Sequence, residues 1–556
     1  MTEHKLRRFL APDLALALAM FTALYCVLAF NAPQSLFRDA DSGWHIVTGE
    51  RILNEHRLPQ SDPYSFTRAG QPWFAWEWAS DCAMALAYRK AGLPGVVWLF
   101  VLVIAAVTWL WFRLSWAVGG NFLFAAAFAA PMLSTANLHW YARPHLFGWV
   151  LLLAAIWYFE KAPPRFRARD AAVMIGAGAL WANMHASFPL LPLMALIYAV
   201  AHFARPLIWR LETAIEISKG RWFLWAALLS GAATLLNPYG WNLHGHVVQY
   251  LVNGELLDRI GEFQSFNFHA AGSAQIMIAL GIAGVGGVLA LAERKLAHFL
   301  LTILFLAAAL RSARALPIAA LVLLPLANGA ITDALRKARD LRLGLHRALH
   351  AFLGYSDRLR LLDGRFSGMA FAPVFAVLLY FGLQAPAVAS HTSFPADQFP
   401  VLAANELSLL PQNIRLLAPD KYGGYLIFRF HGQRKVFFDG RSDFYGSAFI
   451  KQYVRLFEVR PGWQKQVDDF GFTHALLPND YSLIPALQQI GWKIVFRDEV
   501  ATLLAAPVEH PERTRKSGVS RPVFLRRQAA KPYSRYHHTG LETCATGNLW
   551  IVKRHS

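Results

Sequence analysis

The sequence predicts an α-helical membrane protein that crosses the bilayer about eleven times and carries a small C-terminal α/β domain. Three observations support this fold class. Of the 556 residues, 55% are hydrophobic, and the mean hydropathy is +0.31, which is too apolar for a water-soluble chain of this length. Apolar runs of about 20 residues recur along most of the chain. The basic residues between these runs gather in alternate loops, as the positive-inside rule requires.

Each predicted membrane helix is an apolar run long enough, or nearly long enough, to cross a bilayer. These runs lie near residues 10–30, 94–117, 121–137, 145–160, 170–184, 187–207, 222–237, 274–292, 296–311, 314–330 and 366–386. We expect the first run to be an uncleaved anchor, because no convincing cleavage site of small residues accompanies it.

The basic loops orient the predicted helices. With the N-terminus in the cytoplasm, loops 161–169, 205–221, 293–295 and 336–365 all face the cytoplasm and are all basic. The opposite, outer face then receives segments 31–93, 138–145, 183–187, 237–273 and 311–314, and everything after about residue 387. We therefore predict a transmembrane domain over 1–388, with surface helices in its first outer loop at 31–93, an outer α/β domain over 389–508, and a basic, disordered tail over 509–556.

The net charge of +19 and the three cysteines restrict the function. Most of the positive charge lies in loops predicted to face the cytoplasm and in the tail, which favours contact with anionic membrane lipids over binding of nucleic acid. Cys26, Cys82 and Cys544 are too few and too scattered for a disulfide framework or a Cys-type metal site.

The first outer loop begins with an Asp-x-Asp motif directly after the first predicted helix. A carboxylate of Asp39 or Asp41 at the bilayer surface could act as general base on a hydroxyl, or help to bind a divalent cation beside a phosphate. No fixed metal-binding spacing such as His-Glu-x-x-His is present, so a cation stays unassigned. The apolar spacing over 43–58 predicts a helix on the membrane surface that positions the Asp pair.

Aromatic residues surround this motif. Trp44 and His45 follow the Asp pair, and Trp73, Trp76 and Trp78 belong to the same loop. These tryptophans suit either an interfacial aromatic belt or a platform on which a sugar ring stacks.

The predicted outer domain alternates short apolar runs with helix-like stretches. The runs at 435–438, 474–477 and 492–496 favour strands, and 449–458 and 482–490 favour helices. Asp439, Arg441 and Asp443 lie in the motif Asp-Gly-Arg-Ser-Asp. They could contact a glycan acceptor, or they could stabilise a turn by local Asp–Arg pairing.

The motifs of the first outer loop resemble those of a known family. Residues 39–45 read Asp-x-Asp-x-x-Trp-His, residues 58–67 read Leu-Pro-x-x-Asp-Pro-Tyr-Ser-Phe-Thr, and residues 73–78 read Trp-Phe-Ala-Trp-Glu-Trp. Together with the many predicted membrane helices, this pattern resembles the membrane glycosyltransferases of the GT-C superfamily, and in particular a largely uncharacterised group of bacterial multispan proteins. The resemblance covers most of residues 10–500, and Lys-Tyr-Gly-Gly-Tyr at 421–425 is similar to a motif of the same group.

The resemblance implies an inverting glycosyltransferase at the outer face of a bacterial inner membrane, with the C-terminal domain in the periplasm. Its donor would be a sugar linked to a polyprenyl phosphate, and its acceptor an envelope glycan, lipid or protein. An acidic residue of the first outer loop would be the base, which here is Asp41 or Asp39, with Asp41 preferred.

Charge develops on the phosphate of such a donor as the glycosidic bond breaks, so positive or hydrogen-bonding groups are expected near it. Ionisable groups at a membrane boundary are costly unless paired or hydrated, and their concentration on one face favours a polar cavity there. The candidate substrate-binding residues share this outer position: Trp44, His45, Glu77, Arg143, His145, His185, Asn237, Tyr239, Glu262, Arg311 and Arg314.

Two other functions remain open from the sequence. A transporter or flippase of a lipid-linked saccharide would favour inverted repeats and charges near the bilayer midplane, whereas no repeat is visible and the polar residues collect at one face. A non-catalytic assembly partner for an envelope polysaccharide would tolerate loss of Asp39 and Asp41.

Overall fold

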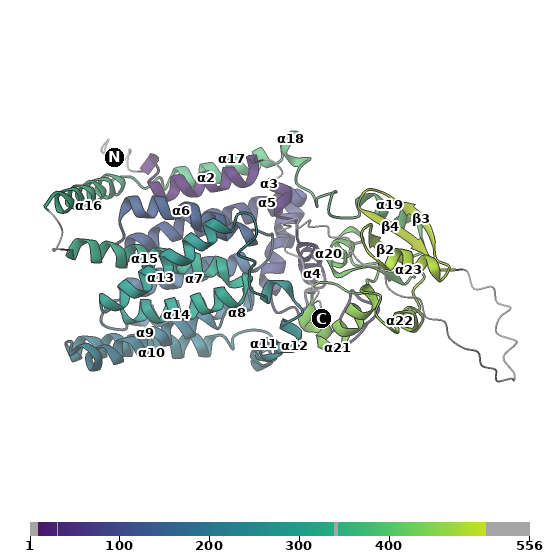
Figure 1. Ribbon diagram of the computed structural model, residues 1–556, viewed down its shortest axis with the longest axis horizontal. Helices are drawn as coiled ribbons and strands as arrows, with labels where there is room; N and C mark the ends of the chain where they lie inside the picture. Colours follow the sequence, from purple (N-terminus) through teal and green to yellow (C-terminus); the bar gives the residue numbers. More distant parts are fainter. Residues whose placement is uncertain (1–8, 30–31, 339–342, 508–556) are drawn as a thin grey trace, which may run out of the picture.

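The structure is a computed structural model that describes residues 9–29, 32–338 and 343–507. The predicted tail over 509–556 lies outside the described residues. Most of the described chain is helical, with a small sheet near its C-terminal end (Figure 1).

Elongated helices form a bundle whose members run roughly along the long axis of the molecule (Figure 1). They are α2 (Leu14–Leu28), α5 (Trp78–Ala117), α6 (Phe122–Ala136), α7 (His145–Glu160), α8 (Ala168–Met184), α9 (Leu190–Trp209), α10 (Thr213–Ala233), α13 (Ser273–Ala292), α14 (Leu296–Arg311), α15 (Leu316–Lys337) and α17 (Phe371–Leu383). Each of the eleven predicted apolar runs coincides with one of these helices.

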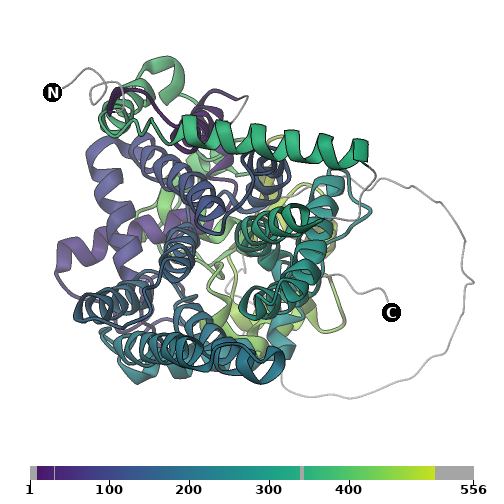
Figure 2. The same ribbon diagram turned by 90° about the vertical axis from the view of Figure 1, so that its left-hand side faces the viewer.

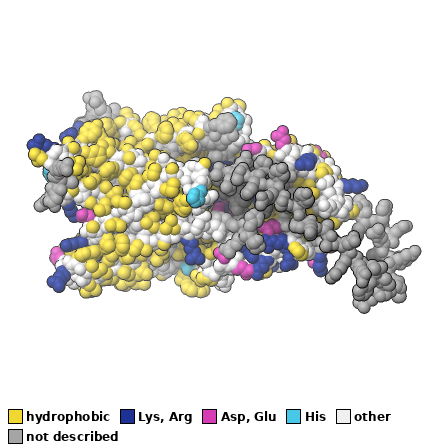
Figure 3. Space-filling view, viewed as in Figure 1, with side chains coloured by type: hydrophobic (Ala, Val, Ile, Leu, Met, Phe, Trp, Pro, Cys, Tyr) yellow, Lys and Arg dark blue, Asp and Glu magenta, His cyan; other side chains and the backbone are white. Residues whose placement is uncertain are grey.

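The chain is a membrane protein by the length and composition of these helices. Within the described residues, five helical stretches are long and apolar enough to cross a bilayer: Trp78–Ala117, Phe122–His139, Leu190–Trp209, Ser273–Ala292 and Ala313–Lys337. Shorter apolar helices include α2, α7, α14 and α17. The number of crossings, about eleven, stays a prediction. Hydrophobic side chains cover the flank of the bundle, and charged side chains gather toward its two ends (Figure 3).

Helix α5 differs from its prediction, because it begins at Trp78 rather than near residue 94. Ala91 and Gly92 have non-helical backbone angles, and Pro94 follows. The first segment of α5 packs on α4 (Asp41–Glu55), the predicted surface helix. The kink thus separates a segment that supports α4 from an apolar segment in the bundle.

Further helical elements of 3 to 21 residues lie between or beside the bundle helices. They are α3 (Ala32–Ser35), η1 (Asn137–His139), α11 (Trp241–Val252), α12 (Gly254–Leu257), η2 (Gly261–Phe263), η3 (Ala313–Ala315), α16 (Leu343–Asp363) and α18 (Pro386–Ala389). Helices α4, α11 and α12 lie at the end of the bundle that faces the C-terminal part (Figure 1), whereas α16 lies across the other end (Figure 2).

The C-terminal part contains helices and one four-stranded sheet, as an α/β interpretation requires. Its elements are α19 (Val401–Leu409), β1 (Leu416–Leu417), α20 (Asp420–Arg429), α21 (Ser442–Phe457), α22 (Trp463–Phe470), β2 (His474–Pro478), α23 (Leu483–Gln489), β3 (Lys493–Arg497) and β4 (Ala501–Ala505). The strand order is β1-β2-β4-β3, with β1 and β2 parallel and the other pairs antiparallel.

The strand predicted over 435–438 is wrong. This segment forms a single bridge to the first outer loop, because Val436 N–H donates to the Tyr64 carbonyl at 2.9 Å and Phe66 N–H donates to the Val436 carbonyl at 3.1 Å. Phe437 and Phe438 are buried among the helices of the C-terminal part. The segment therefore ties the C-terminal part to the first outer loop.

Candidate functional site

The two carboxylates of the Asp-x-Asp motif lie where α4 begins. Asp39 precedes the helix, and its Oδ1 accepts a hydrogen bond from the backbone N–H of Asp41 at 2.9 Å. Asp41 is the first residue of α4, where the free N–H groups of the helix favour a negative charge. Both side chains are buried. The motif therefore marks the beginning of α4. The helix was predicted to begin after the Asp pair, whereas Asp41 is its first residue.

Arg143 holds the two carboxylates together. It follows η1 in a turn that is fixed to the segment before α4, because the N–H of Ala142 donates to the carbonyl of Leu36 at 2.8 Å. Its Nη1 lies 2.6 Å from Oδ2 of Asp39, and its Nη2 lies 3.0 Å from Oδ2 of Asp41. One planar guanidinium thus donates a hydrogen bond to Asp39 and forms an ion pair with Asp41, which fixes the relative position of the two carboxylates.

Burial changes the acidity of this pair. Removal from water raises the pKa of Asp39 to about 7, and the positive charge of Arg143 opposes this shift. Burial also raises the pKa of Asp41, again against the effect of Arg143. A carboxyl with a pKa near neutrality is a stronger base than an ordinary aspartate, so the pair suits proton transfer.

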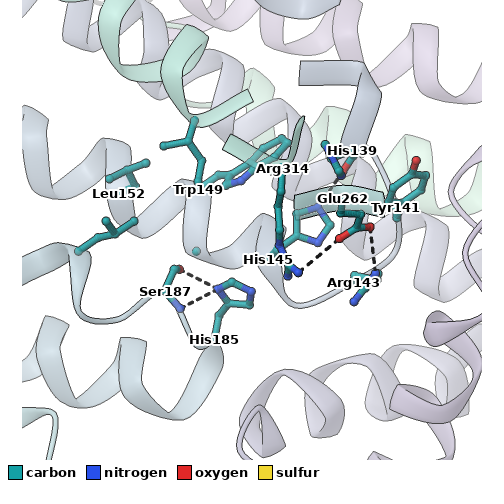
Figure 4. A pocket seen from close by; sticks show the side chains of 13 residues that line it. His139, Tyr141, Arg143, His145, Trp149, Leu152, His185, Ser187, Glu262 and Arg314 are labelled. Atoms are coloured by element: carbon teal, nitrogen blue, oxygen red, sulfur yellow. Dashed lines mark hydrogen bonds and ion pairs between the residues drawn. The ribbon is translucent and has the colours of Figure 1, made fainter. Parts of the chain in front are cut away.

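A second acid–base pair lies beside Arg143 (Figure 4). Glu262 in η2 and Arg314 in η3 approach to 3.3 Å, and Glu262 also lies 3.7 Å from Arg143. Burial alone would raise the pKa of Glu262, but Arg314, Arg143 and His139 outweigh it, so its pKa is lowered. Glu262 is therefore ionised and links the two arginines.

A buried chain of histidines and carboxylates continues from the site. His45 Nδ1 lies 2.6 Å from Asp81 Oδ1, and its Nε2 lies 3.8 Å from Glu77 Oε2. On the other side, Glu77 Oε1 lies 3.5 Å from His185 Nε2. His185 Nδ1 accepts the backbone N–H of Ser187 at 3.1 Å, which leaves the ring proton on the nitrogen that faces Glu77.

Glu77 is the N-cap of α5 and titrates near neutrality. Burial raises its pKa to about 7, although Arg143 and Arg314 act in the opposite direction. Burial also lowers the pKa of His45 and of His185 well below the ordinary value. Both imidazoles are therefore neutral at pH 7, and Glu77 exchanges its proton in that range.

These groups surround a cavity of about 370 Å³. Asp41 lines it, whereas Asp39 is not among the lining residues. The lining residues are Asp41, Trp44, Trp76, Glu77, Arg143, Pro144, His145, His185, Ala186, Ser187, Pro189, Leu190, Leu193, Val247, Tyr250, Leu251, Ile260, Glu262, Phe263, Arg314, Gly440, Arg441, Ser442 and Asp443. A smaller cavity of about 40 Å³, between His139, Trp149 and Ile318, shares several of these residues (Figure 4).

One side of the larger cavity is apolar and reaches the hydrophobic flank of the bundle. Leu193 on α9 and Leu251 on α11 line the cavity and are 39% and 56% exposed. Leu196 and Val200, farther along α9, are also exposed. The cavity therefore combines a charged interior with an apolar mouth.

The C-terminal part supplies another wall. Residues 440–443 line the cavity, and Gly440 lies so close to Asp41 that a Cβ atom at this position would be 1.9 Å from Asp41 Oδ1. Gly424 on α20 approaches the Ala40 carbonyl in the same way, at 2.2 Å from its ideal Cβ. Only glycine permits these approaches, so the C-terminal part and the start of α4 fit together as one unit.

The motif at 439–443 is held by local pairing, as the structural alternative predicts. Arg441 Nε and Nη2 donate to the two oxygens of Asp439 at 2.8 and 2.7 Å, and Nη2 also donates to Asp62 at 2.8 Å. Asp443, by contrast, lines the cavity, where its Oδ2 lies 2.8 Å from His246 Nε2. The motif thus combines a structural ion pair with one carboxylate in the cavity wall.

Four predicted substrate-binding residues, His45, Asn237, Tyr239 and Arg311, do not line either cavity of the site, although His45 belongs to the chain of groups behind it. Asn237 donates to the carbonyls of Thr234 and Gly240, which closes the turn before α11. Tyr239 packs on Phe74, and Arg311 ends α14. The remaining predicted residues, Trp44, Glu77, Arg143, His145, His185, Glu262 and Arg314, line the larger cavity.

A divalent cation stays unassigned. Within the described ranges, no group of three or more His, Cys, Asp or Glu side chains has the arrangement of a metal site. Asp39 and Asp41, the predicted candidates, both face the guanidinium of Arg143.

Several residues of the site were missed by sequence reasoning. Asp81 follows Glu77 by four residues, so a helical interpretation of 77–81 would have placed both on one face. Asp62 belongs to the Leu-Pro-x-x-Asp-Pro motif. An aspartate before proline indicates a turn, which hides its part in the site. No local signal indicates that Gly440 contacts Asp41, because the two lie far apart in the sequence.

Comparisons with known proteins find similar chains among solved structures. No protein-family model matches the sequence, and no curated protein matches it. Among solved structures, the chain is similar to the crystal structure of the Archaeoglobus fulgidus oligosaccharyltransferase in the apo form. The two are 12% identical, the match covers 84% of this chain and 69% of that chain, and the TM-score is 0.47. A likeness of this size does not establish a shared reaction.

Proposed function

We propose that this protein is a membrane glycosyltransferase that moves a sugar from a polyprenyl-phosphate-linked donor to a hydroxyl of an envelope glycan, lipid or protein. One observation carries the proposal. The buried carboxylate pair of Asp39 and Asp41, held by Arg143, lies at a cavity that is charged inside and apolar at its mouth. Such a cavity suits a substrate with a polar sugar phosphate and a long hydrocarbon chain.

Asp41 acts as the base in this proposal, because it lines the cavity and Asp39 does not. Its carboxylate accepts the proton of the acceptor hydroxyl, and the oxygen attacks the anomeric carbon. The bond from that carbon to the phosphate oxygen breaks on the opposite side, and the phosphate leaves with the electron pair. The configuration at the anomeric carbon is inverted. Asp39 positions Asp41 through the Asp41 N–H and through Arg143.

Negative charge on the leaving phosphate needs donors on the other side of the cavity. Arg314 is a third exposed, and His145 and His185 line the same wall. The Arg314 guanidinium can stabilise this developing charge in a site with little water. The apolar mouth near Leu193 and Leu251 admits the polyprenyl chain sideways from the bilayer.

The distribution of charge supports an outer-face reaction. The loops at 161–169, 205–221 and 293–295 are basic and belong to the end of the bundle away from α4 and the C-terminal part. By the positive-inside rule that end faces the cytoplasm. In a bacterial inner membrane, the cavity and the C-terminal part would then face the periplasm, where the acceptor approaches.

The experiment is a donor-turnover assay on purified full-length protein in proteoliposomes. Wild type, Asp41→Asn and the exposed control Asp469→Asn are incubated with a panel of polyprenyl-phosphate-linked hexoses and pentoses. Release of polyprenyl phosphate is measured with and without a mixture of envelope glycans and lipids as acceptor. We expect at least one donor to be consumed by wild type and by Asp469→Asn, and not by Asp41→Asn.

Three outcomes would contradict the proposal. Equal consumption by wild type and Asp41→Asn would remove Asp41 from the reaction. If no donor is consumed, while a labelled lipid-linked sugar changes leaflet only in vesicles that contain the protein, the chain is a flippase. Full restoration of envelope glycans in cells by an Asp39→Asn, Asp41→Asn double variant would instead support a non-catalytic assembly role.

A further inference from the structure

A second cavity lies at the opposite end of the bundle from the candidate site. Its volume is about 230 Å³, and it is formed where α5 and α7 end, α14 begins and α9 and α10 pass. It is lined by Ala117, Val118, Phe159, Glu160, Ala162, Tyr198, Ala201, His202, Arg205, Lys219, Phe223, Lys295, Leu296, Ala297 and His298. This is the left end of the bundle in Figure 1, the end predicted to face the cytoplasm.

The first turn of α14 opens into this cavity. Leu296, Ala297 and His298 line it and are buried. Their backbone N–H groups have no acceptor within the described part of the chain. The first N–H groups of a helix carry a partial positive charge and bind anions when no protein acceptor satisfies them. This helix start therefore offers donors that a ligand can use.

His298 adds an independent, unpartnered group. Its Nε2 lies 2.9 Å from Oε1 of Glu160, which also accepts from the hydroxyl of Tyr198. The residue is 6% exposed, and its Nδ1 has no partner among the residues that the structure describes. A buried polar atom without a partner costs about 1–3 kcal/mol. A bound group that contacts Nδ1 would remove this cost.

Basic side chains complete the cavity. Lys219 has no ion-pair partner in the described ranges. Arg205 donates Nη1 to Glu216 at 2.9 Å, while its Nε is buried without a partner there. Lys295 pairs with Asp333 at 2.7 Å. Glu160 is the only carboxylate among the lining residues, and Tyr198 and His298 both contact its Oε1, so basic and N–H groups outnumber acidic ones in this cavity.

We propose that this cavity binds a phosphate group, through the N–H groups at the start of α14, His298 and Lys219. A phosphate offers several acceptor oxygens and a negative charge, which match backbone donors, a lysine and the Nδ1–H of a doubly protonated His298, whose Nε2–H is donated to Glu160. Its source is either the headgroup of an anionic phospholipid or a free phosphate compound on the same side of the membrane. The site is separate from the glycosyl-transfer cavity, so the proposal does not depend on that function.

The test measures phosphate binding by purified full-length wild type, Lys219→Gln, His298→Asn and the control Lys465→Gln. Lys465 is exposed on α22, in the C-terminal part. In one arm, native mass spectrometry follows retention of phosphatidylglycerol against phosphatidylcholine. In the other, the thermal unfolding midpoint is followed with inorganic phosphate or glycerol phosphate against chloride at equal ionic strength.

Each result has a defined meaning. Selective retention of phosphatidylglycerol that is roughly tenfold weaker in Lys219→Gln, and unchanged in Lys465→Gln, assigns the site to a lipid headgroup. Stabilisation by free phosphate that is lost in Lys219→Gln assigns it to a soluble phosphate. The proposal is overturned if wild type and Lys219→Gln behave alike in both arms, or if Lys465→Gln weakens binding equally. If His298→Asn does not fold, the Lys219→Gln comparison alone decides.

Discussion

Gly440 leaves no room for a side chain beside Asp41, since a Cβ atom at Gly440 would lie 1.9 Å from Oδ1 of Asp41. Gly440→Ala must therefore move either the carboxylate or the 439–443 segment. We expect transfer activity to fall about a hundredfold, as displacement of a reacting group by about 1 Å does elsewhere. The measurement is the initial rate of polyprenyl phosphate release. Gly254→Ala is the matched control, because no atom lies within 4 Å of its ideal Cβ. Activity of Gly440→Ala equal to that of the control would show that Asp41 does not need its observed position.

The acidity of the carboxylate pair predicts a pH profile. A base works when ionised, so the wild-type rate is low below its pKa and reaches a plateau above it. Since burial raises the pKa of Asp41, the proposed base, we expect the rate to rise with pH above the range in which an ordinary aspartate ionises. Arg143 lowers the pKa of both carboxyls, so Arg143→Gln shifts the rise to higher pH.

The control for this profile is Arg143→Lys. Lysine keeps the positive charge but loses the planar guanidinium that contacts both carboxylates. Its rate is expected to be lower than that of wild type, with the rise at nearly the same pH. An Arg143→Gln profile that is unmoved, or moved to lower pH, would contradict the assigned electrostatics.

The ion pair behind the cavity wall predicts a stability change. Arg441 is buried and donates to Asp439 and Asp62, so Arg441→Met leaves two buried carboxylates without their cation. Loss of one partner from a buried pair costs about 3–5 kcal/mol. We expect a clearly lower thermal unfolding midpoint in detergent. Arg460→Met removes an exposed arginine next to Glu458 and should change stability by less than about 0.5 kcal/mol. Similar midpoints for both variants would refute a structural role for Arg441.

The apolar mouth predicts a selective effect on long-chain donors. Leu193→Trp adds bulk where α9 lines the cavity, and overpacking at such a position should raise KM for a long polyprenyl donor about tenfold. KM for a short-chain, water-soluble donor analogue should stay unchanged. Leu196→Trp, on the same helix but outside the cavity lining, serves as control. An equal rise in KM for both donors would indicate a general packing defect and no lipid path at this mouth.

The sequence predicts well those features that depend on local patterns. The apolar runs match the bundle helices, and the spacing over 43–58 matches α4. The beginning of α5 was missed because residues 78–93 are too polar to read as membrane-spanning, although they are helical. The prediction of a strand at 435–438 was wrong. A short apolar run does not show whether the segment pairs in a sheet or with a distant loop.

The site was predictable in composition and not in arrangement. Asp39, Asp41 and Arg143 were identified from their residue types and their common predicted face. Arg143 can bridge the two carboxylates because its turn is held to Leu36 by a hydrogen bond from the N–H of Ala142. This contact joins segments that are distant in the sequence, so no local pattern encodes it. The exclusion of Asn237, Tyr239 and Arg311 from the cavity has the same cause. Each lies at the predicted end of the bundle, but Asn237 and Tyr239 contact other groups there and Arg311 is exposed to the surface.

The most direct test of the proposed reaction is the single-turnover rate of polyprenyl phosphate release by Asp41→Asn and Asp39→Asn, with a donor that wild type consumes. Loss of the general base should lower the rate of Asp41→Asn by about 10³-fold. Asp39→Asn should lose less, because Asp39 positions Asp41 and does not line the cavity. Correctly inserted Asp41→Asn protein that releases polyprenyl phosphate at the wild-type rate would contradict the account.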